Sequence, residues 1–285
     1  MRAKIVSLSL AFVLGTGAAA AQQSPKTPNV ADIYCSGTVT REPLPYDTYL
    51  ISGEESFYKT TFSQGDYVYI NKGASAGVKV GDQFLVMRAV KDGLKFQWFR
   101  WQPILLHAMG TQWKDLGRLR VVVAQPDVSI AQVVYACDSM QRGDYVRPFA
   151  ERPAPPLRET RKFDRFAPAS GREKAMVVSA KDFRQSLGAN DVMYVNLGSA
   201  QGVKVGDYFR IFRYQGTRHE TPYQLYGTAY KVYGFGRTTV RYNWDQLPRD
   251  ILGEGVVLRV SENAATVLIT YSLREIYLGD YAEIE

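Results

Sequence analysis

Two nearly identical phrases constrain the fold of this chain more than any other feature of its sequence. Gly73–Phe84 reads GASAGVKVGDQF, and Gly198–Phe209, 125 residues later, reads GSAQGVKVGDYF. Extending the comparison to Asp66–Arg88 and Asp191–Arg213 gives 12 identities in 23 positions without a gap. Self-similarity over this length identifies the unit of folding. The phrases therefore predict two related units that follow one another.

A weaker match lies downstream, at an offset of 136 residues. Segments that begin at Gly117 and Gly253 share several positions, and both end in Gly-Asp-Tyr, at 143–145 and 279–281. The offset grows because the second unit has a longer middle. We therefore expect a tandem duplication with this organisation: a signal peptide at 1–21, a disordered N-terminus at 22–32, a first β module at 33–149, a Pro-rich basic linker at 150–173 and a second β module at 174–285.

The secondary structure within each unit is expected to be mostly β. Short runs of Val, Ile, Tyr and Thr recur between Gly, Asn and Asp, which is typical of strands and turns. No segment has a long helical period, although Ser129–Gln141 and Trp101–Leu116 could hold short helical turns. Each unit is therefore predicted to be a small, partly closed β barrel or β sandwich.

The residues of the repeated phrase can be explained by the turns that they form. Glycine can take a positive φ that other residues resist, and an aspartate after it can hold a turn. Val78 and Val80 flank Lys79, so both valines are expected to point inward. The predicted turn residues are Gly77, Gly81, Asp82, Gly143, Asp144, Gly202, Gly206, Asp207, Gly279 and Asp280. Paired carboxylates can also perform acid–base chemistry on sugars, but nothing in the sequence brings two of these together.

The first copy also matches G-x-S-x-G, the nucleophile elbow of serine hydrolases. Ser75 would be the nucleophile, with His107 as its base. The second copy keeps the glycines but has Ala200 in place of the serine. An elbow needs a helix after the serine, whereas Val-Lys-Val-Gly-Asp follows here. The sequence therefore favours a non-catalytic protein without a cofactor, and a serine hydrolase is a remote alternative.

The N-terminal residues have the pattern of a secretory signal peptide. Arg2 and Lys4 precede an apolar run at Ile5–Leu14, and small residues end at Ala21. The apolar run is too short to span a bilayer comfortably, although a retained anchor is the alternative. We expect a periplasmic protein with no membrane span after cleavage. The net charge of +7 includes Arg2 and Lys4; the remaining basic surface suits anionic wall polymer or lipid, and nucleic acid is not expected.

The two cysteines, Cys35 and Cys137, lie near the two ends of the first unit. Export permits a disulfide between them, which would clamp that unit. Two buried free thiols are the alternative. Together with His107 and His219 they match no zinc spacing, so no metal site is predicted.

Between the units, 150–172 contains several prolines and many charges, which predicts an extended linker. Its excess of Arg and Lys could contact a partner, or the segment could be a solvated spacer.

The middle segments of the two units, 96–113 and 221–244, differ most between the units, so any specialised recognition is expected there. Aromatic rings with an interleaved Arg can stack on sugars or anchor a protein interface; they can equally plug the open end of a barrel. The second middle reads as a hairpin with aromatic faces, a plausible docking element. The candidate binding residues are Trp98, Arg100, Trp101 and Trp113 in the first unit, and Tyr223, Tyr226, Tyr230 and Tyr233 in the second.

The pattern N-x-G-x-x-x-G-V-K-V-G-D-x-F-x-V/I-x-R, followed by G-x-x-x-V and a final G-D-Y, resembles the C-terminal domain of the flagellar assembly protein T family and related β modules of bacterial envelope proteins. This resemblance covers about 60 residues in each unit. It implies a periplasmic, non-catalytic module that works by assembly.

The leading hypothesis is therefore an exported structural or interaction protein of the cell envelope. Its partner would be another envelope protein, a second copy of this chain, or peptidoglycan. Direct glycan binding through the exposed aromatic residues is the alternative.

Overall fold

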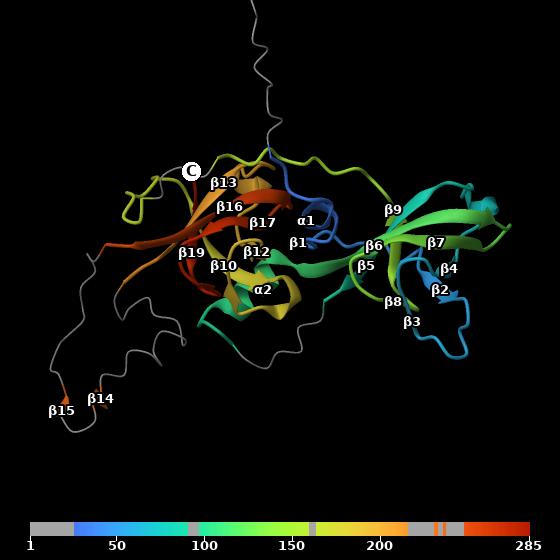
Figure 1. The fold of residues 1–285 in the computed structure, drawn as a ribbon, viewed down its shortest axis with the longest axis horizontal. Helices are drawn as coiled ribbons and strands as arrows, with labels where there is room; N and C mark the ends of the chain where they lie inside the picture. Colours follow the sequence, from blue (N-terminus) through green and yellow to red (C-terminus); the bar gives the residue numbers. More distant parts are fainter. Residues whose placement is uncertain (1–25, 91–96, 160–163, 216–230, 233–235, 238–247) are drawn as a thin grey trace, which may run out of the picture.

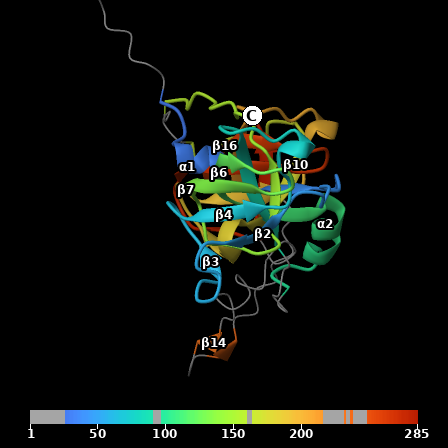
Figure 2. The same ribbon diagram turned by 90° about the vertical axis from the view of Figure 1, so that its right-hand side faces the viewer.

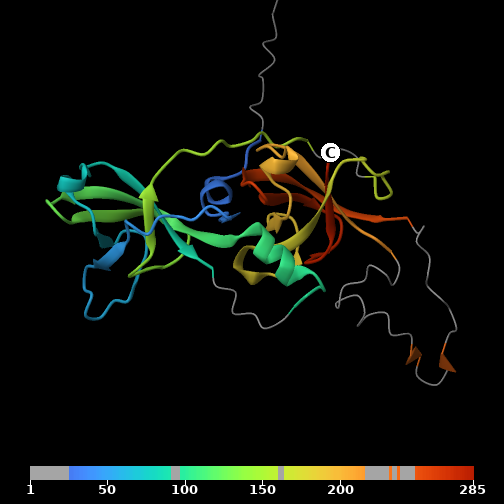
Figure 3. The same ribbon diagram turned by 180° about the vertical axis from the view of Figure 1, so that it is seen from behind.

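The fold was analysed in a computed structural model, which describes residues 26–90, 97–159, 164–215, 231–232, 236–237 and 248–285. Two bodies of β structure lie along the long axis of the molecule (Figure 1). The segment after β9 runs along one side from the first body to the second (Figures 1 and 3). The described chain is mostly β, as the sequence predicts, and none of its helices is long and apolar enough to cross a membrane.

The first body is a curled antiparallel sheet in the order β2-β4-β7-β6-β5-β9, with β1 paired to the start of β6. Its edges approach each other, because the Leu50 N–H donates to the Asp144 carbonyl at 3.0 Å and the Val146 N–H donates to the Thr48 carbonyl at 2.9 Å. Figure 2 looks onto this body from its free end. Its elements are α1 (Val30–Tyr34), β1 (Thr38–Thr40), β2 (Leu50–Gly53), β3 (Thr61–Phe62), β4 (Tyr67–Ile70), η1 (Ala74–Ala76), β5 (Gln83–Ala89), α2 (Gln102–Met109), β6 (Thr111–Ala124), β7 (Ser129–Ala136), β8 (Met140–Gln141) and β9 (Tyr145–Pro148).

The second body is a closed barrel in the order β10-β12-β17-β16-β13-β19, in which β19 pairs back onto β10. Closure leaves no unpaired sheet edge in this ring. Strand for strand, the order is the one found in the first body. Its elements are β10 (Lys174–Ala180), η2 (Lys181–Phe183), β11 (Ser186–Leu187), β12 (Val192–Val195), η3 (Ser199–Gln201), β13 (Tyr208–Arg213), β14 (Lys231–Val232), β15 (Gly236–Arg237), β16 (Asp250–Val260), β17 (Ala265–Ser272), β18 (Ile276–Tyr277) and β19 (Tyr281–Ile284).

Side-chain burial explains why the strands form where they do. In β4 burial alternates, with Val68 and Ile70 fully buried and Tyr67 facing solvent, as expected for a sheet with one wet face. In β12 all four residues are buried, because the second barrel has its own interior and is also covered from outside. Part of that cover comes from the first unit: Phe99 and Met109 belong to the apolar core of the second barrel. The two bodies are therefore packed together and not merely tethered.

The repeated phrase forms the same turn in both bodies. Gly77 and Gly202 have φ of 86° and 80°, and each closes a three-residue 3-10 turn. In the second copy the Asp207 carboxylate accepts the Lys204 N–H at 2.8 Å, and the first copy repeats this bond. The inward direction expected for Val80 is wrong: its side chain is 67% exposed, because the chain is already in the turn at that point, and only Val78 reaches the core.

Two segments differ from the sequence-based expectation. The disordered N-terminus predicted at 22–32 is wrong for Val30–Asp32, which begin α1. A reciprocal capping box between Asn29 and Asp32 starts that helix, and buried Ile33 anchors it. The helical turn expected within Trp101–Leu116 occurs as α2, whereas Ser129–Gln141 contains only the strands β7 and β8.

The linker is not a solvated spacer throughout. Arg152 reaches a carboxylate of the first body, Arg158 pairs with Glu254, and Arg165 pairs with Asp250 at 2.7 Å. The basic side chains that the sequence offers to a partner are thus partly used within the chain. The linker binds along both bodies.

Candidate functional site: the junction and cleft between the barrels

The aromatic segment predicted for binding lies mainly between the two bodies. Trp98 is partly buried against the core of the second barrel. Trp101 is 53% exposed, and the Arg100 guanidinium lies over its ring at 4.9 Å. Trp113 is only 5% exposed, because its indole packs against Leu85, Met87 and Tyr145. Trp113 therefore offers no ring to a ligand, which corrects its assignment as a binding residue.

The four tyrosines predicted in the second unit, Tyr223, Tyr226, Tyr230 and Tyr233, lie outside the described residues. Arg100 and Trp101 are thus the candidates that the described structure places at the surface.

Helix α2 explains why the first middle segment is rich in apolar residues. Buried Gln102 donates through Nε2 to the Val178 carbonyl on β10 at 2.9 Å, and its Oε1 accepts the Trp98 N–H at 2.9 Å. Figure 3 shows α2 beside the second barrel, with β6 running from it into the first. This segment therefore joins the two units.

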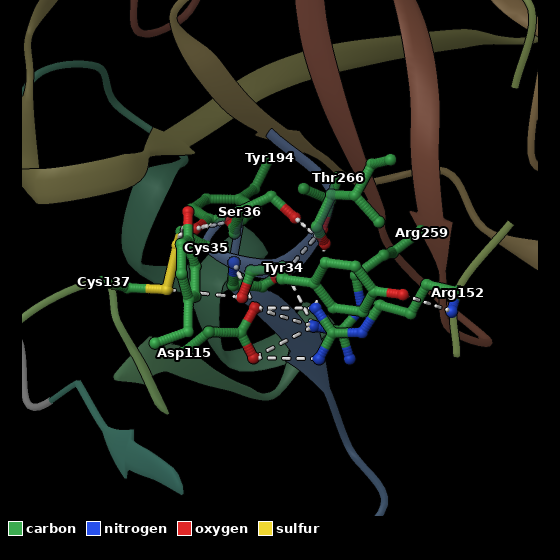
Figure 4. A network of polar contacts seen from close by, with 12 residues as sticks. Tyr34, Cys35, Ser36, Asp115, Cys137, Arg152, Tyr194, Arg259 and Thr266 are labelled. Atoms are coloured by element: carbon green, nitrogen blue, oxygen red, sulfur yellow. Dashed lines mark hydrogen bonds and ion pairs between the residues drawn. A yellow bond between two sulfur atoms is a disulfide. The ribbon is translucent and has the colours of Figure 1, made fainter. Parts of the chain in front are cut away.

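A buried carboxylate organises the polar part of the junction. Both oxygens of Asp115, on β6, accept hydrogen bonds from Arg152, at 2.9 and 3.1 Å. Arg259, on β16 of the second barrel, approaches the same carboxylate at 3.3 and 3.5 Å, and the Gly37 N–H donates to it at 2.9 Å. The Asp115 side chain has no exposed surface. Figure 4 shows two guanidinium groups converging on this one carboxylate.

The segment between α1 and β1 supplies backbone acceptors to the second barrel. The Ser36 carbonyl accepts the Tyr194 hydroxyl at 2.8 Å, and the Gly37 carbonyl accepts Arg259 Nη1 at 3.1 Å (Figure 4). The Val39 carbonyl accepts the Ser261 hydroxyl at 2.5 Å. Burial raises the pKa of Tyr194 above its ordinary value, so its hydroxyl remains a donor at neutral pH.

Burial also changes the pKa of Arg259, one of the two cations at this junction. It lowers the pKa of Arg259 to about 10, because the guanidinium is removed from water while Asp115 only partly compensates it. The group is still a cation at neutral pH. Its position is energetically expensive unless an anion lies nearby.

The Cys35–Cys137 disulfide holds this segment in place. It joins the residue after α1 to the loop after β7, with the two Cα atoms 5.5 Å apart (Figure 4). Ser36 and Gly37 follow immediately, so the disulfide positions the carbonyls that the second barrel binds.

A cleft of about 690 Å³ opens beside the junction. β1, β5 and the end of β9 form one side, and the end of β16 with the turn after it forms the other. Leu44 and Val260 supply apolar surface, whereas Leu85 and Met87 are buried, and none of the described lining residues is aromatic. The charged residues that line it are Arg41, Glu42, Arg147, Arg152, Arg259 and Glu262.

The four arginines of the cleft differ in how far they are paired. Arg41 and Arg147 form no ion pair with any residue that the structure describes, whereas Arg152 and Arg259 share Asp115. Sequence reasoning identified none of these residues as a site. The only signal was the excess of Arg and Lys in the linker, which contains Arg152.

The predicted Gly-Asp turns near the ends of the two units also hold ion pairs that the sequence did not suggest. Asp144 accepts Arg88 Nε and Nη2, both at 2.7 Å. Asp280 accepts Arg213 Nε and Nη2, also at 2.7 Å. Each arginine is the last residue of the extended repeat, Asp66–Arg88 or Asp191–Arg213. The paired appearance of that arginine and the final Gly-Asp in both units was the available signal.

The residues of the hydrolase hypothesis lie in different places. Ser75 is exposed in η1, whose N–H groups bind the carbonyls of Gln125 and Pro126. His107 lies on α2, and no hydrogen bond joins the two among the described residues. Within the same residues, no three His, Cys, Asp or Glu side chains are grouped so as to hold a metal ion.

Comparison with known proteins adds no relative: no protein-family model matches the chain, and no curated protein matches it.

Proposed function

We propose that this chain is an exported, non-catalytic interaction protein of the bacterial cell envelope, in which two duplicated barrels act as one scaffold. The signal-peptide pattern at 1–21 supports export to the periplasm. The resemblance to the C-terminal domain of the flagellar assembly protein T family supports a role in assembly.

Three parallels support the duplication. The strand order is the same in both bodies. Gly73 and Gly198 open equivalent turns, and each lies so close to the neighbouring hairpin that an added Cβ would meet a carbonyl oxygen at 2.1 or 2.2 Å. The fork between Arg88 and Asp144 has its counterpart in the second unit, as described above. Equivalent ion pairs at equivalent places are expected of two descendants of one module.

The observation that carries the scaffold proposal is the junction. Apolar residues around α2 and the shared carboxylate Asp115 join the two units. The disulfide, within the first unit, holds the segment whose carbonyls the second barrel binds, so the cleft has a defined shape. A defined cleft between two domains is a common place for ligands. We infer that the partner binds at this junction and not at the repeated loops, which serve the fold.

The proposal is tested with the mature chain and envelope extracts. We expect fractionation to recover the protein in the periplasm with Gln22 as its first residue. We also expect it to copurify at a fixed ratio with one envelope protein, or to sediment as a defined oligomer. A protein that stays in the cytoplasm, or that is a monomer with no stoichiometric partner, would contradict the proposal.

Peptidoglycan binding is the second candidate, favoured by the exposed ring of Trp101 with Arg100 above it. Stacking of sugars on an aromatic ring resists salt, whereas attraction between charges does not. Retention on purified sacculi at high salt that is lost in Trp101→Ala would favour it. The hydrolase alternative is tested by Ser75→Ala once a hydrolytic activity is found.

A further inference from the structure

We propose that the cleft between the barrels binds an acidic peptide segment of a protein partner, a stretch with at least two carboxylates. This inference rests on the proposed function, because it names the partner chemistry for an interaction protein. It is carried by the charges that line the cleft and by the incomplete pairing of Arg259 with Asp115 at the inner wall of the cleft.

The cleft contains more positive than negative groups. Among the described residues, four guanidinium groups line it, against two carboxylates, Glu42 and Glu262. Asp115 lies behind the wall and is already engaged by Arg152 and Arg259. An anionic ligand would therefore enter a region of positive potential whose walls partly exclude water, where charge complementarity is strong.

The geometry at the inner wall points to an oxyanion. Arg152 takes both oxygens of Asp115 at ordinary distances, whereas Arg259 contacts them at 3.3 and 3.5 Å through Nη1 alone. Arg259 thus makes no complete fork with Asp115 and lines the cleft. Arginine binds carboxylates through two parallel hydrogen bonds when its fork is free. A ligand carboxylate would complete this pairing.

Outside this wall, Arg41 and Arg147 supply two further cations. Arg41 follows β1 and Arg147 lies within β9, so they approach the cleft from different elements of the first body. A single small anion would satisfy only part of this arrangement. A short chain carrying several carboxylates can reach the inner and outer arginines together.

The rest of the lining favours a peptide over a glycan. Sugar rings are commonly recognised by stacking on aromatic side chains, and within the part of the chain that the structure describes no residue lining the cleft is aromatic. Leu44 and Val260, both half-buried, offer apolar surface for the aliphatic parts of a peptide. The volume of about 690 Å³ is suitable for a few residues.

The test measures fluorescence anisotropy of a labelled hexaglutamate peptide with the mature chain, and a hexaglutamine peptide is the uncharged control. We expect hexaglutamate alone to bind, with affinity that falls between about 20 mM and about 300 mM salt. Arg41→Glu and Arg147→Glu should each weaken binding by about tenfold, the loss expected for one charge-assisted hydrogen bond. Arg120→Glu makes the same change of charge at an exposed site on β6 outside the cleft, and it should change the affinity less than about twofold.

Equal weakening by all three variants would overturn the proposal, because binding would then follow net charge and not the cleft. Displacement of the probe by inorganic phosphate or soluble muropeptides as readily as by unlabelled hexaglutamate would also overturn it. If a charge-reversed variant fails to fold, Arg41→Gln and Arg147→Gln replace it with the same expected direction. Failure of hexaglutamate to bind a protein that still captures a stoichiometric envelope partner would reject this inference alone and leave the proposed function standing.

Discussion

Replacing Asp115 with asparagine should destabilise the protein strongly, although it removes only one charge. The variant leaves the side chains of Arg152 and Arg259, which are 13% and 22% exposed, without their shared anion. Removing one partner of a buried ion pair costs about 3–5 kcal/mol. The asparagine oxygen can still accept the Gly37 N–H, which retains about 1 kcal/mol. We therefore expect a loss of about 3 kcal/mol in the free energy of unfolding.

The measurement is urea unfolding of the mature protein, followed by tryptophan fluorescence. With a slope of about 2 kcal/mol per molar urea, the midpoint should fall by about 1.5 M. Asp47→Asn is the matched control, since Asp47 pairs with Lys72 at 2.6 Å but its side chain is 61% exposed. Such surface pairs contribute about 0–1 kcal/mol.

A second variant separates the charge effect from a general loss of packing. Asp115→Asn combined with Arg259→Met removes one of the two uncompensated cations, so it should regain about half of the lost stability. If Asp115→Asn loses no more stability than Asp47→Asn, the junction does not depend on this carboxylate, and the reasoning about the barrel interface is refuted.

Further consequences can be measured on the same protein. Gly198→Ala should lower the thermal midpoint sharply or prevent folding, because the added Cβ would lie 2.2 Å from the Ser261 carbonyl oxygen, whereas Gly188→Ala meets nothing within 4 Å and should be close to neutral. Reduction of the disulfide, which closes a loop with a sequence separation of 102, should cost about 2–5 kcal/mol in unfolding experiments with and without reductant; an unchanged midpoint would contradict a clamping role. A hydrogen bond from Lys114 lowers the pKa of Asp138. The stability that this ionised carboxylate contributes is present above its unfolded pKa and is lost as pH falls through its folded pKa. Lys114→Met should therefore lose less stability than the wild type on acidification from neutral pH to below about pH 4.

Parts of the fold follow from local sequence rules. The β class follows from runs such as 67–70 and 192–195, since alternation and β-branched residues act over a few neighbouring positions. The turn at Gly77 follows from the same kind of rule, because only glycine takes its φ of 86° cheaply. The prediction for Val80 failed because a period of two continues only while the chain remains extended.

The candidate site did not follow from such rules. Trp113 reads like a binding residue in the sequence, but the partners that bury it come from β5 and β9. The aromatic composition of a segment indicates how much apolar surface its side chains can bury. It does not state whether a ligand or another part of the chain covers that surface.

The sequence by itself determined the strand-rich class, the positions of the sharp turns and the presence of two cysteines able to pair. Only the tertiary structure decided that Asp115 meets Arg152 and Arg259, which are 37 and 144 residues further along the chain. Local propensity acts over a few residues, whereas a charge cluster depends on how complete barrels pack. The cleft, with its arginines gathered in one place, therefore exists only once the curled sheet and the closed barrel have formed and docked.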